Sequence, residues 1–134
     1  VRKKILIEID RFSKQESFYE NTLMPLQYLL NRQELTIEPI AAFARKLIET
    51  LCELLSNSPG ASLDEQIREL RQSNNYSRAF IQRLYLIKAF GNSAVHYQKQ
   101  TSNYIVLNEQ DLFILLLLVY ETLQNFPYGK IEIR

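Results

Sequence analysis

The segment PIAAFARKLIETLCELLS, residues 39–56, carries the clearest structural signal in the chain. Its apolar residues recur every three or four positions, which is typical of the buried stripe of an amphipathic helix. A proline near the start suits the first turn of a helix, and the following SNSPG sequence favours a turn. We therefore predict a helix from about Pro39 to Ser56. Its buried stripe comprises Ile40, Phe43, Ala44, Leu47, Ile48, Leu51, Leu54 and Leu55.

Helical patterns also occupy most of the chain on either side of this segment. The sequence from Ser62 to Glu65 is a capping box, and Ser77 and Asn108 are suitable N-caps for two later helices. Pro25 lies within an earlier helical pattern, where it either kinks the helix or marks a later start of the helix. We predict these helices over residues 16–32, 62–72, 78–96 and 108–124.

The last predicted helix contains the longest apolar run, LFILLLLVY at residues 112–120. This run is much shorter than the roughly 20 residues that a transmembrane helix needs. We therefore expect the most deeply buried helix of the protein here, and no membrane partner.

Isoleucine-rich sequences occur at both ends, KILIEI at residues 4–9 and KIEIR at residues 130–134. The second alternates apolar and polar side chains, as half-buried strands do. We predict short strands within residues 1–10 and 129–134. For the whole chain we predict one domain, residues 1–134, with an all-α fold that forms a four- to five-helix bundle.

The composition argues against several classes of function. Sixteen Lys and Arg residues against 15 Asp and Glu residues give a net charge of +1, which favours neither nucleic acid nor membranes overall. The single Cys52 excludes an intrachain disulfide and suits the cytoplasm. One cysteine and one histidine cannot build a usual zinc site, and there is no glycine-rich phosphate loop. We expect neither a metal nor a cofactor.

One polar cluster interrupts the predicted helix over residues 78–96. Lys88, Asn92 and His96 follow one another at intervals of four, so an unbroken helix places them along one face. Gly91 is unfavourable within a helix by about 1 kcal/mol relative to alanine, and we expect another helix to pack closely there. Asn92 and His96 form either a proton-transfer site in a cleft or a buried hydrogen-bonded pair. The local pattern favours the buried pair.

Arg45 and Glu49 form a second candidate pair, four residues apart on the predicted helix over residues 39–56. Glu49 could orient His96 by accepting a hydrogen bond from one ring nitrogen. Alternatively, Arg45 and Glu49 form a solvated surface pair worth a few tenths of a kcal/mol. The sequence leaves both interpretations open.

Three sequences together resemble a known family: AFARKLIETL, SLDEQIREL and LIKAFGNSAVHY, at residues 42–51, 62–70 and 86–97. They are similar to the domain of unknown function 4145, over about residues 36–126. The resemblance implies a four- or five-helix domain related to the HEPN superfamily of prokaryotic defence systems. Such domains occur alone or beside the nuclease and translocase parts of type I restriction R subunits.

The HEPN resemblance raises the hypothesis of a metal-independent ribonuclease, with His96 at a dimer cleft. Catalytic members carry an arginine followed by four to six residues and a histidine. In this chain the corresponding positions are Ala89, Phe90 and Gly91, so the arginine is missing. Lys88 lies one position too far away and cannot make the forked phosphate contact of an arginine.

The middle third of the chain is a candidate nucleic-acid surface, because its basic residues outnumber its acidic ones. In this interpretation, Tyr76, Tyr85 and Tyr97 are stacking partners for bases. The alternative is that the arginines solvate helix faces while the tyrosines pack in the core. The candidate contacts are Arg68, Arg71, Arg78 and Arg83.

The sequence as a whole favours a non-catalytic interaction module of a defence or restriction system. We expect a homodimer or a neighbouring protein domain as partner, with nucleic acid as an alternative partner. Close packing at Gly91 would bring two helices together. The polar network predicted at that crossing comprises Arg45, Glu49, Asn92 and His96.

Overall fold

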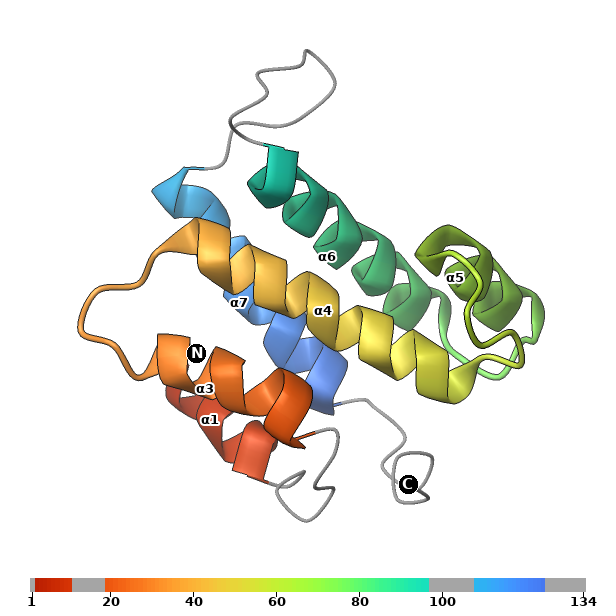
Figure 1. Ribbon diagram of the computed structural model, residues 1–134, viewed down its shortest axis with the longest axis horizontal. Helices are drawn as coiled ribbons and strands as arrows, with labels where there is room; N and C mark the ends of the chain where they lie inside the picture. The colour runs from red at the N-terminus through yellow and green to blue at the C-terminus, as the bar shows by residue number, and fades with distance from the viewer. Residues whose placement is uncertain (1, 11–18, 97–107, 125–134) are drawn as a thin grey trace.

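The computed structural model describes residues 2–10, 19–96 and 108–124, and these form six α-helices and no strand (Figure 1). This confirms the all-α prediction, with one helix more than expected. A short π-helical turn, η1 (Tyr19–Leu23), precedes the second helix. The α-helices are α1 (Arg2–Asp10), α3 (Met24–Leu30), α4 (Ile37–Leu55), α5 (Leu63–Gln72), α6 (Arg78–His96) and α7 (Glu109–Gln124).

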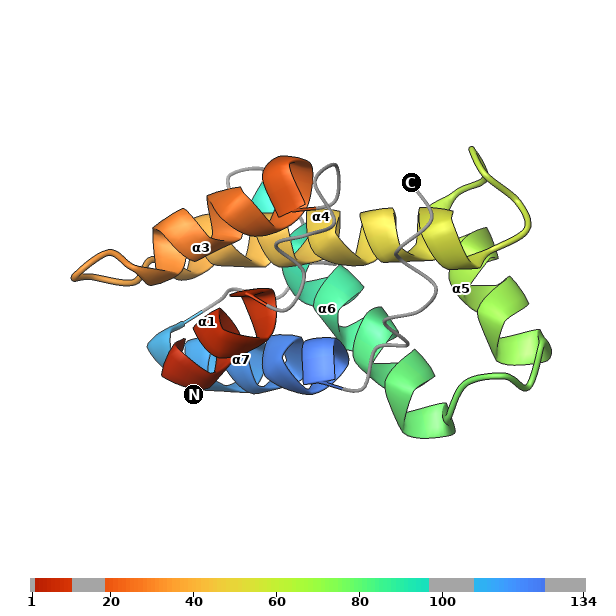
Figure 2. The same cartoon turned by 90° about the horizontal axis from the view of Figure 1, so that it is seen from below.

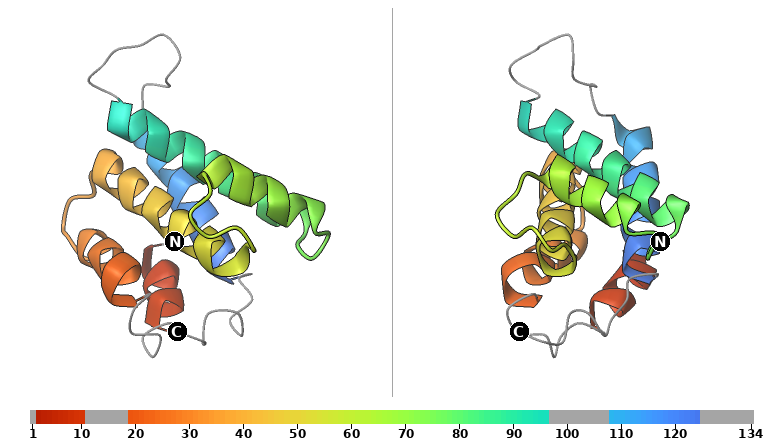
Figure 3. Two further views of the ribbon diagram at one scale, coloured as in Figure 1. Left: turned by 45° about the vertical axis from the view of Figure 1, so that its right-hand side comes forward. Right: turned by 90° about the vertical axis from the view of Figure 1, so that its right-hand side faces the viewer.

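The helix α4 lies at the centre of the arrangement and contacts α3, η1, α5, α6 and α7. Figure 2 shows α3 and α4 on one side and α1 and α7 on the other, with α6 running obliquely between them. The helix α5 covers the end of the bundle where α4 ends and α6 begins (Figure 3). The predicted stripe of α4 supplies much of the core, including Leu47, Ile48 and Leu51, which are fully buried.

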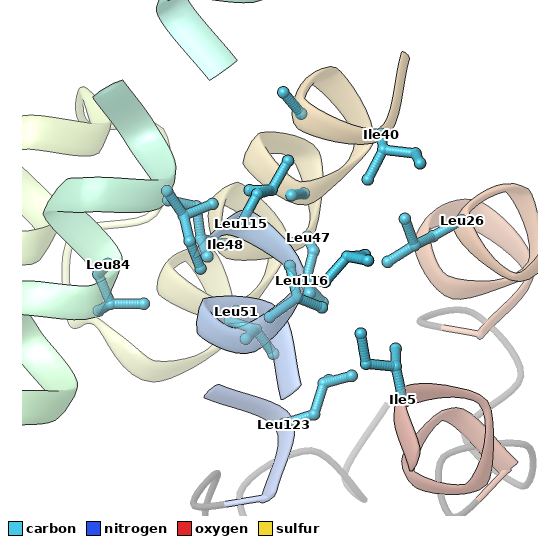
Figure 4. Packing of buried hydrophobic residues seen from close by; sticks show 14 of the residues in the cluster. Ile5, Leu26, Ile40, Leu47, Ile48, Leu51, Leu84, Leu115, Leu116 and Leu123 are labelled. Atoms are coloured by element: carbon cyan, nitrogen blue, oxygen red, sulfur yellow. The ribbon is translucent and has the colours of Figure 1, made fainter. Parts of the chain in front are cut away.

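All six α-helices contribute side chains to this core, part of which is shown in Figure 4. Ile5 of α1 and Leu26 of α3 point towards Leu47 of α4 and Leu116 of α7, while Leu84 approaches from α6. Burial of this apolar surface is the main stabilising contribution to the fold.

The predicted N-terminal strand is wrong, because residues 2–10 form α1. A strand would place Ile5, Ile7 and Ile9 on one face, since successive side chains alternate. The structure instead buries Ile5 and Ile9, four residues apart, and leaves Ile7 61% exposed. A spacing of four residues between buried side chains is typical of a helix. The other predicted strand, residues 129–134, lies outside the described residues.

Two further expectations need correction. The helix predicted over residues 16–32 is described only from Tyr19 and consists of η1 followed by α3, with Pro25 in the first turn of α3. The helix α7 is not the most buried helix, because Phe113, Ile114 and Leu117 are exposed. An unbroken apolar run cannot show which of its faces has a partner.

The helix starts of α5, α6 and α7 agree with the predicted N-caps. Ser62 Oγ accepts a hydrogen bond from the Glu65 backbone N–H at 3.2 Å, and Ser77 Oγ accepts one from Phe80 N–H at 3.1 Å. The return bond of the capping box, to the backbone of Ser62, is not formed among the described residues. A reciprocal pair occurs at α7 instead, where Asn108 Oδ1 caps Asp111 N–H and Asp111 Oδ2 accepts from Asn108 N–H.

Replacement of Ser62 by alanine should lower the free energy of unfolding by about 1 kcal/mol, because the N-cap hydrogen bond is lost. Urea denaturation followed by circular dichroism measures this change. Thr36 is the matched control, since it occupies the N-cap of α4 without a side-chain cap hydrogen bond. Thr36→Ala should have a much smaller effect, and equal effects of the two substitutions would contradict the assignment.

Candidate functional site

The helices α4 and α6 pack closely at Gly91. The two helices run antiparallel (Figure 1). Gly91 is buried against the side chain of Arg45. A Cβ atom at position 91 would lie 2.8 Å from Arg45 Cδ and 3.0 Å from Arg45 Cγ, and closer still to Arg45 Cβ. Ser93 also faces inward, whereas Ala89 is exposed. Only a residue without a side chain permits this packing.

The guanidinium of Arg45 lies partly inside this crossing. Its Nε atom is buried and has no hydrogen-bond partner. No hydrogen bond or ion pair joins Arg45 to Glu49 or to Asn92, all three of which belong to the described part of the chain. Glu49 is exposed and lines an open groove of about 570 Å³ along α4 together with Arg45 and Thr50. The hydrophobic stem of Arg45, rather than a salt bridge, therefore makes the contact with α6.

The antiparallel arrangement separates Glu49 from His96. Glu49 follows Arg45 by four residues and His96 follows Gly91 by five, in opposite directions. At about 1.5 Å per residue, their backbones are about 13 Å apart along the helix axes. The side chain of His96 lies outside the described residues, so its predicted contact with Glu49 stays a prediction. The structure brings Arg45 to Gly91.

Lys88 is engaged on another side of α6. Its ammonium forms an ion pair with Asp64 in the first turn of α5. The hydrogen bond from Lys88 holds the pKa of the Asp64 carboxyl below its usual value. Because Lys88 is paired with α5, its charge is partly neutralised and is not directed at the crossing of α4 and α6.

Cys52 has the properties of a core residue and not of a nucleophile. It is fully buried in α4, and burial together with the charge of Glu49 raises the pKa of its thiol to about 12.

Metal binding and membrane insertion have no structural support in the described part of the chain either. In the described ranges no cluster of three or more His, Cys, Asp or Glu residues could hold a metal ion. Within the same ranges, every helix is too short or too polar to span a membrane.

The structure divides the four candidate arginines into two kinds. Arg83 pairs with Glu121 of α7 at 3.4 Å, and Arg68 lies near Asp64 on α5. Arg71 and Arg78 instead share a cavity of about 440 Å³ between the end of α5 and the start of α6. The other residues that line this cavity are Asn74, Tyr76, Ile81, Gln82 and Tyr85.

The sequence interpretation included both tyrosines of this cavity but missed Asn74 and Gln82. Gln82 lies four residues after Arg78 and three before Tyr85, so helical spacing could have placed it on the same face. Asn74 adopts a φ of 59°, in the left-handed region that asparagine tolerates better than most residues. No periodic signal in the sequence identifies that turn as a cavity wall. Tyr97 lies outside the described residues.

Comparison of the chain with protein-family models, with curated proteins and with solved structures gave no match.

Replacement of Gly91 by alanine should destabilise the protein by about 1–3 kcal/mol, because the new methyl group overlaps the base of the Arg45 side chain. This loss should exceed the gain of about 1 kcal/mol that alanine brings to an open helix position. The free energy of unfolding in urea is the measurement.

Ala89 provides the matched control, since it is exposed on the same helix two residues earlier. Ala89→Gly should be destabilising by about 1 kcal/mol from helix propensity alone. Alanine would then be favourable at position 89 and unfavourable at position 91. A Gly91→Ala variant more stable than the natural protein would show that the two helices do not pack closely there.

Proposed function

We propose that the chain is a non-catalytic, HEPN-like helical interaction module that forms a homodimer in a prokaryotic defence or restriction system. One observation carries the interaction role, an apolar strip on α7 defined by Phe113, Ile114 and Leu117. Their exposed fractions are 74%, 51% and 47%. Spacings of three and four residues place them on one face of the helix. Exposed apolar clusters of this kind mark protein–protein contact sites.

A second copy of the chain is the partner that suits this strip. An apolar helix face is self-complementary, so two copies related by a two-fold axis can bury the same residues against each other. The net charge of +1 produces little repulsion between two such copies. The defence or restriction setting rests on the sequence resemblance to the domain of unknown function 4145.

The main alternative is a HEPN-like ribonuclease with His96 and Asn92 at a dimer cleft. It would require Lys88 to replace the missing arginine, but Lys88 is paired with Asp64 of α5. Arg45, which lies against Gly91, belongs to α4, a helix that the HEPN motif does not include. These contacts support the non-catalytic proposal.

The second alternative, a nucleic-acid-binding accessory domain, is favoured by a specific observation. Arg71 and Arg78 line one cavity together with two tyrosines. Such a role is compatible with dimerisation, because the cavity belongs to α5 and α6 whereas the strip belongs to α7.

The proposed dimer should depend on the strip of α7. In sedimentation equilibrium, the natural protein should have twice the mass of one chain, and a Phe113→Ser, Leu117→Ser variant should be monomeric. Ile7→Ser is the control, because Ile7 is 61% exposed but lies on α1. That variant should remain dimeric. A monomeric natural protein, or a dimeric strip variant, would overturn the proposed homodimer.

The non-catalytic proposal predicts that the purified protein leaves labelled single-stranded RNA intact. Gel electrophoresis after prolonged incubation without metal is the measurement, and His96→Ala serves as the comparison. Cleavage by the natural protein that disappears in His96→Ala would establish the ribonuclease alternative instead.

A further inference from the structure

The cavity between α5 and α6 has the dimensions and wall chemistry of a small-ligand site. Its volume of about 440 Å³ lies within the range of roughly 300–1,000 Å³ that is usual for such sites. The residues that line it are the buried Ile81, two half-buried tyrosines and four exposed polar or charged residues. No carboxylate is among the described residues that line it.

Arg71 of α5 and Arg78 of α6 differ from Arg83 and Lys88, because neither has a partner among the described residues. Arg83 pairs with Glu121, and Lys88 pairs with Asp64. Neither Arg71 nor Arg78 forms a side-chain hydrogen bond or an ion pair within the described ranges, and both are exposed. Two unpaired guanidinium groups on one cavity produce a positive potential and can each bind a phosphate group through two N–H donors.

The tyrosines of the cavity have different surroundings. The ring of Tyr76 already stacks on Phe80, with ring centroids 5.5 Å apart and planes 27° from parallel. Tyr85 is half-buried and has no aromatic partner among the described residues. Its ring is therefore available for stacking by a planar group that enters the cavity.

Spacing along α6 places the required groups on one face. Arg78, Gln82 and Tyr85 follow one another at intervals of four and three residues. The amide groups of Gln82 and Asn74 add hydrogen-bond donors and acceptors, which suit the edge of a base or a sugar hydroxyl. A charged end, a stacking surface and amide groups thus lie on the wall of a single cavity.

We propose that this cavity binds a nucleotide unit, with its phosphate on Arg71 and Arg78 and its unpaired base on Tyr85. Two sources supply this chemistry, a free nucleotide and a single-stranded nucleic acid. The proposal is independent of the α7 dimer, because it uses none of the residues of the apolar strip.

Binding can be measured by fluorescence anisotropy with a 5′-fluorescein-labelled ten-nucleotide RNA of mixed sequence, and with AMP as unlabelled competitor. The RNA should bind, and binding should weaken with salt because phosphate contacts release counterions. If AMP displaces the RNA at a concentration similar to that of the RNA, the site is assigned to free nucleotides. Retention of the RNA under AMP would assign it to single strands.

Three substitutions connect that binding to the cavity. Arg71→Gln and Arg78→Gln should each weaken RNA binding at least about tenfold, because each removes a charge-assisted contact. Each should also reduce the slope of log K against log salt by about 0.7. Tyr85→Leu keeps an apolar side chain on the bundle but removes the ring, and should weaken binding about 5- to 150-fold.

Arg32→Glu is the control, since Arg32 is exposed and follows α3, away from α5. It changes the net charge more than either glutamine substitution, yet binding should change less than twofold. Thermal melting confirms that each variant is folded. The proposal is overturned if neither RNA nor AMP binds below about 1 mM, or if the Arg78 and Tyr85 variants bind as the natural protein does.

Discussion

The contact between Gly91 and Arg45 determines how closely α4 and α6 can pack, and the rest of the bundle depends on that distance. The helix α4 contacts α3, α5, α6 and α7, so its separation from α6 determines the space left for the other helices. A Cβ atom at position 91 would overlap the Cβ atom of Arg45. That atom can move only if the backbone of α4 moves with it. Interiors are packed at crystal-like density, so such a change would be transmitted to Leu47, Ile48 and the α7 side chains beside them.

This contact also changes the chemical interpretation of the polar residues in LIKAFGNSAVHY. The stem of Arg45 covers Gly91, and its buried Nε atom has no partner, so the residue contributes mainly packing. Lys88 extends to Asp64 on α5, and Glu49 lies on the exposed side of α4. Lys88 therefore belongs to the contact of α6 with α5, whereas Gly91 belongs to the contact of α6 with α4. Charge pairing likewise distinguishes Arg83, which pairs with Glu121, from Arg71 and Arg78, which form no ion pair within residues 2–10, 19–96 and 108–124.

Local signals predicted the parts of the fold that local chemistry controls. The caps at Ser62, Ser77 and Asn108 determine where three helices begin, because each side chain satisfies a backbone N–H of its own first turn. The apolar stripe of α4 was recognisable for the same reason. The N-terminal isoleucines were misassigned because short apolar runs fit a strand or a helix, and contacts with α7 and α3 select the helix. The exposure of Phe113 was unforeseen, because burial depends on neighbours distant in sequence.

The sequence by itself determined the all-α fold class, most of the helix boundaries, the burial of Cys52 and the absence of an arginine at positions 89–91. These properties follow from composition, periodicity and capping, which act over a few residues. Only the tertiary structure decided which cations are paired, which face of α7 lacks cover, and that Arg71, Arg78 and Tyr85 line one cavity. The physical reason is that each of these depends on the antiparallel register of α4 and α6 and on the turn that joins α5 to α6. That register is determined by the packing of side chains from distant parts of the chain.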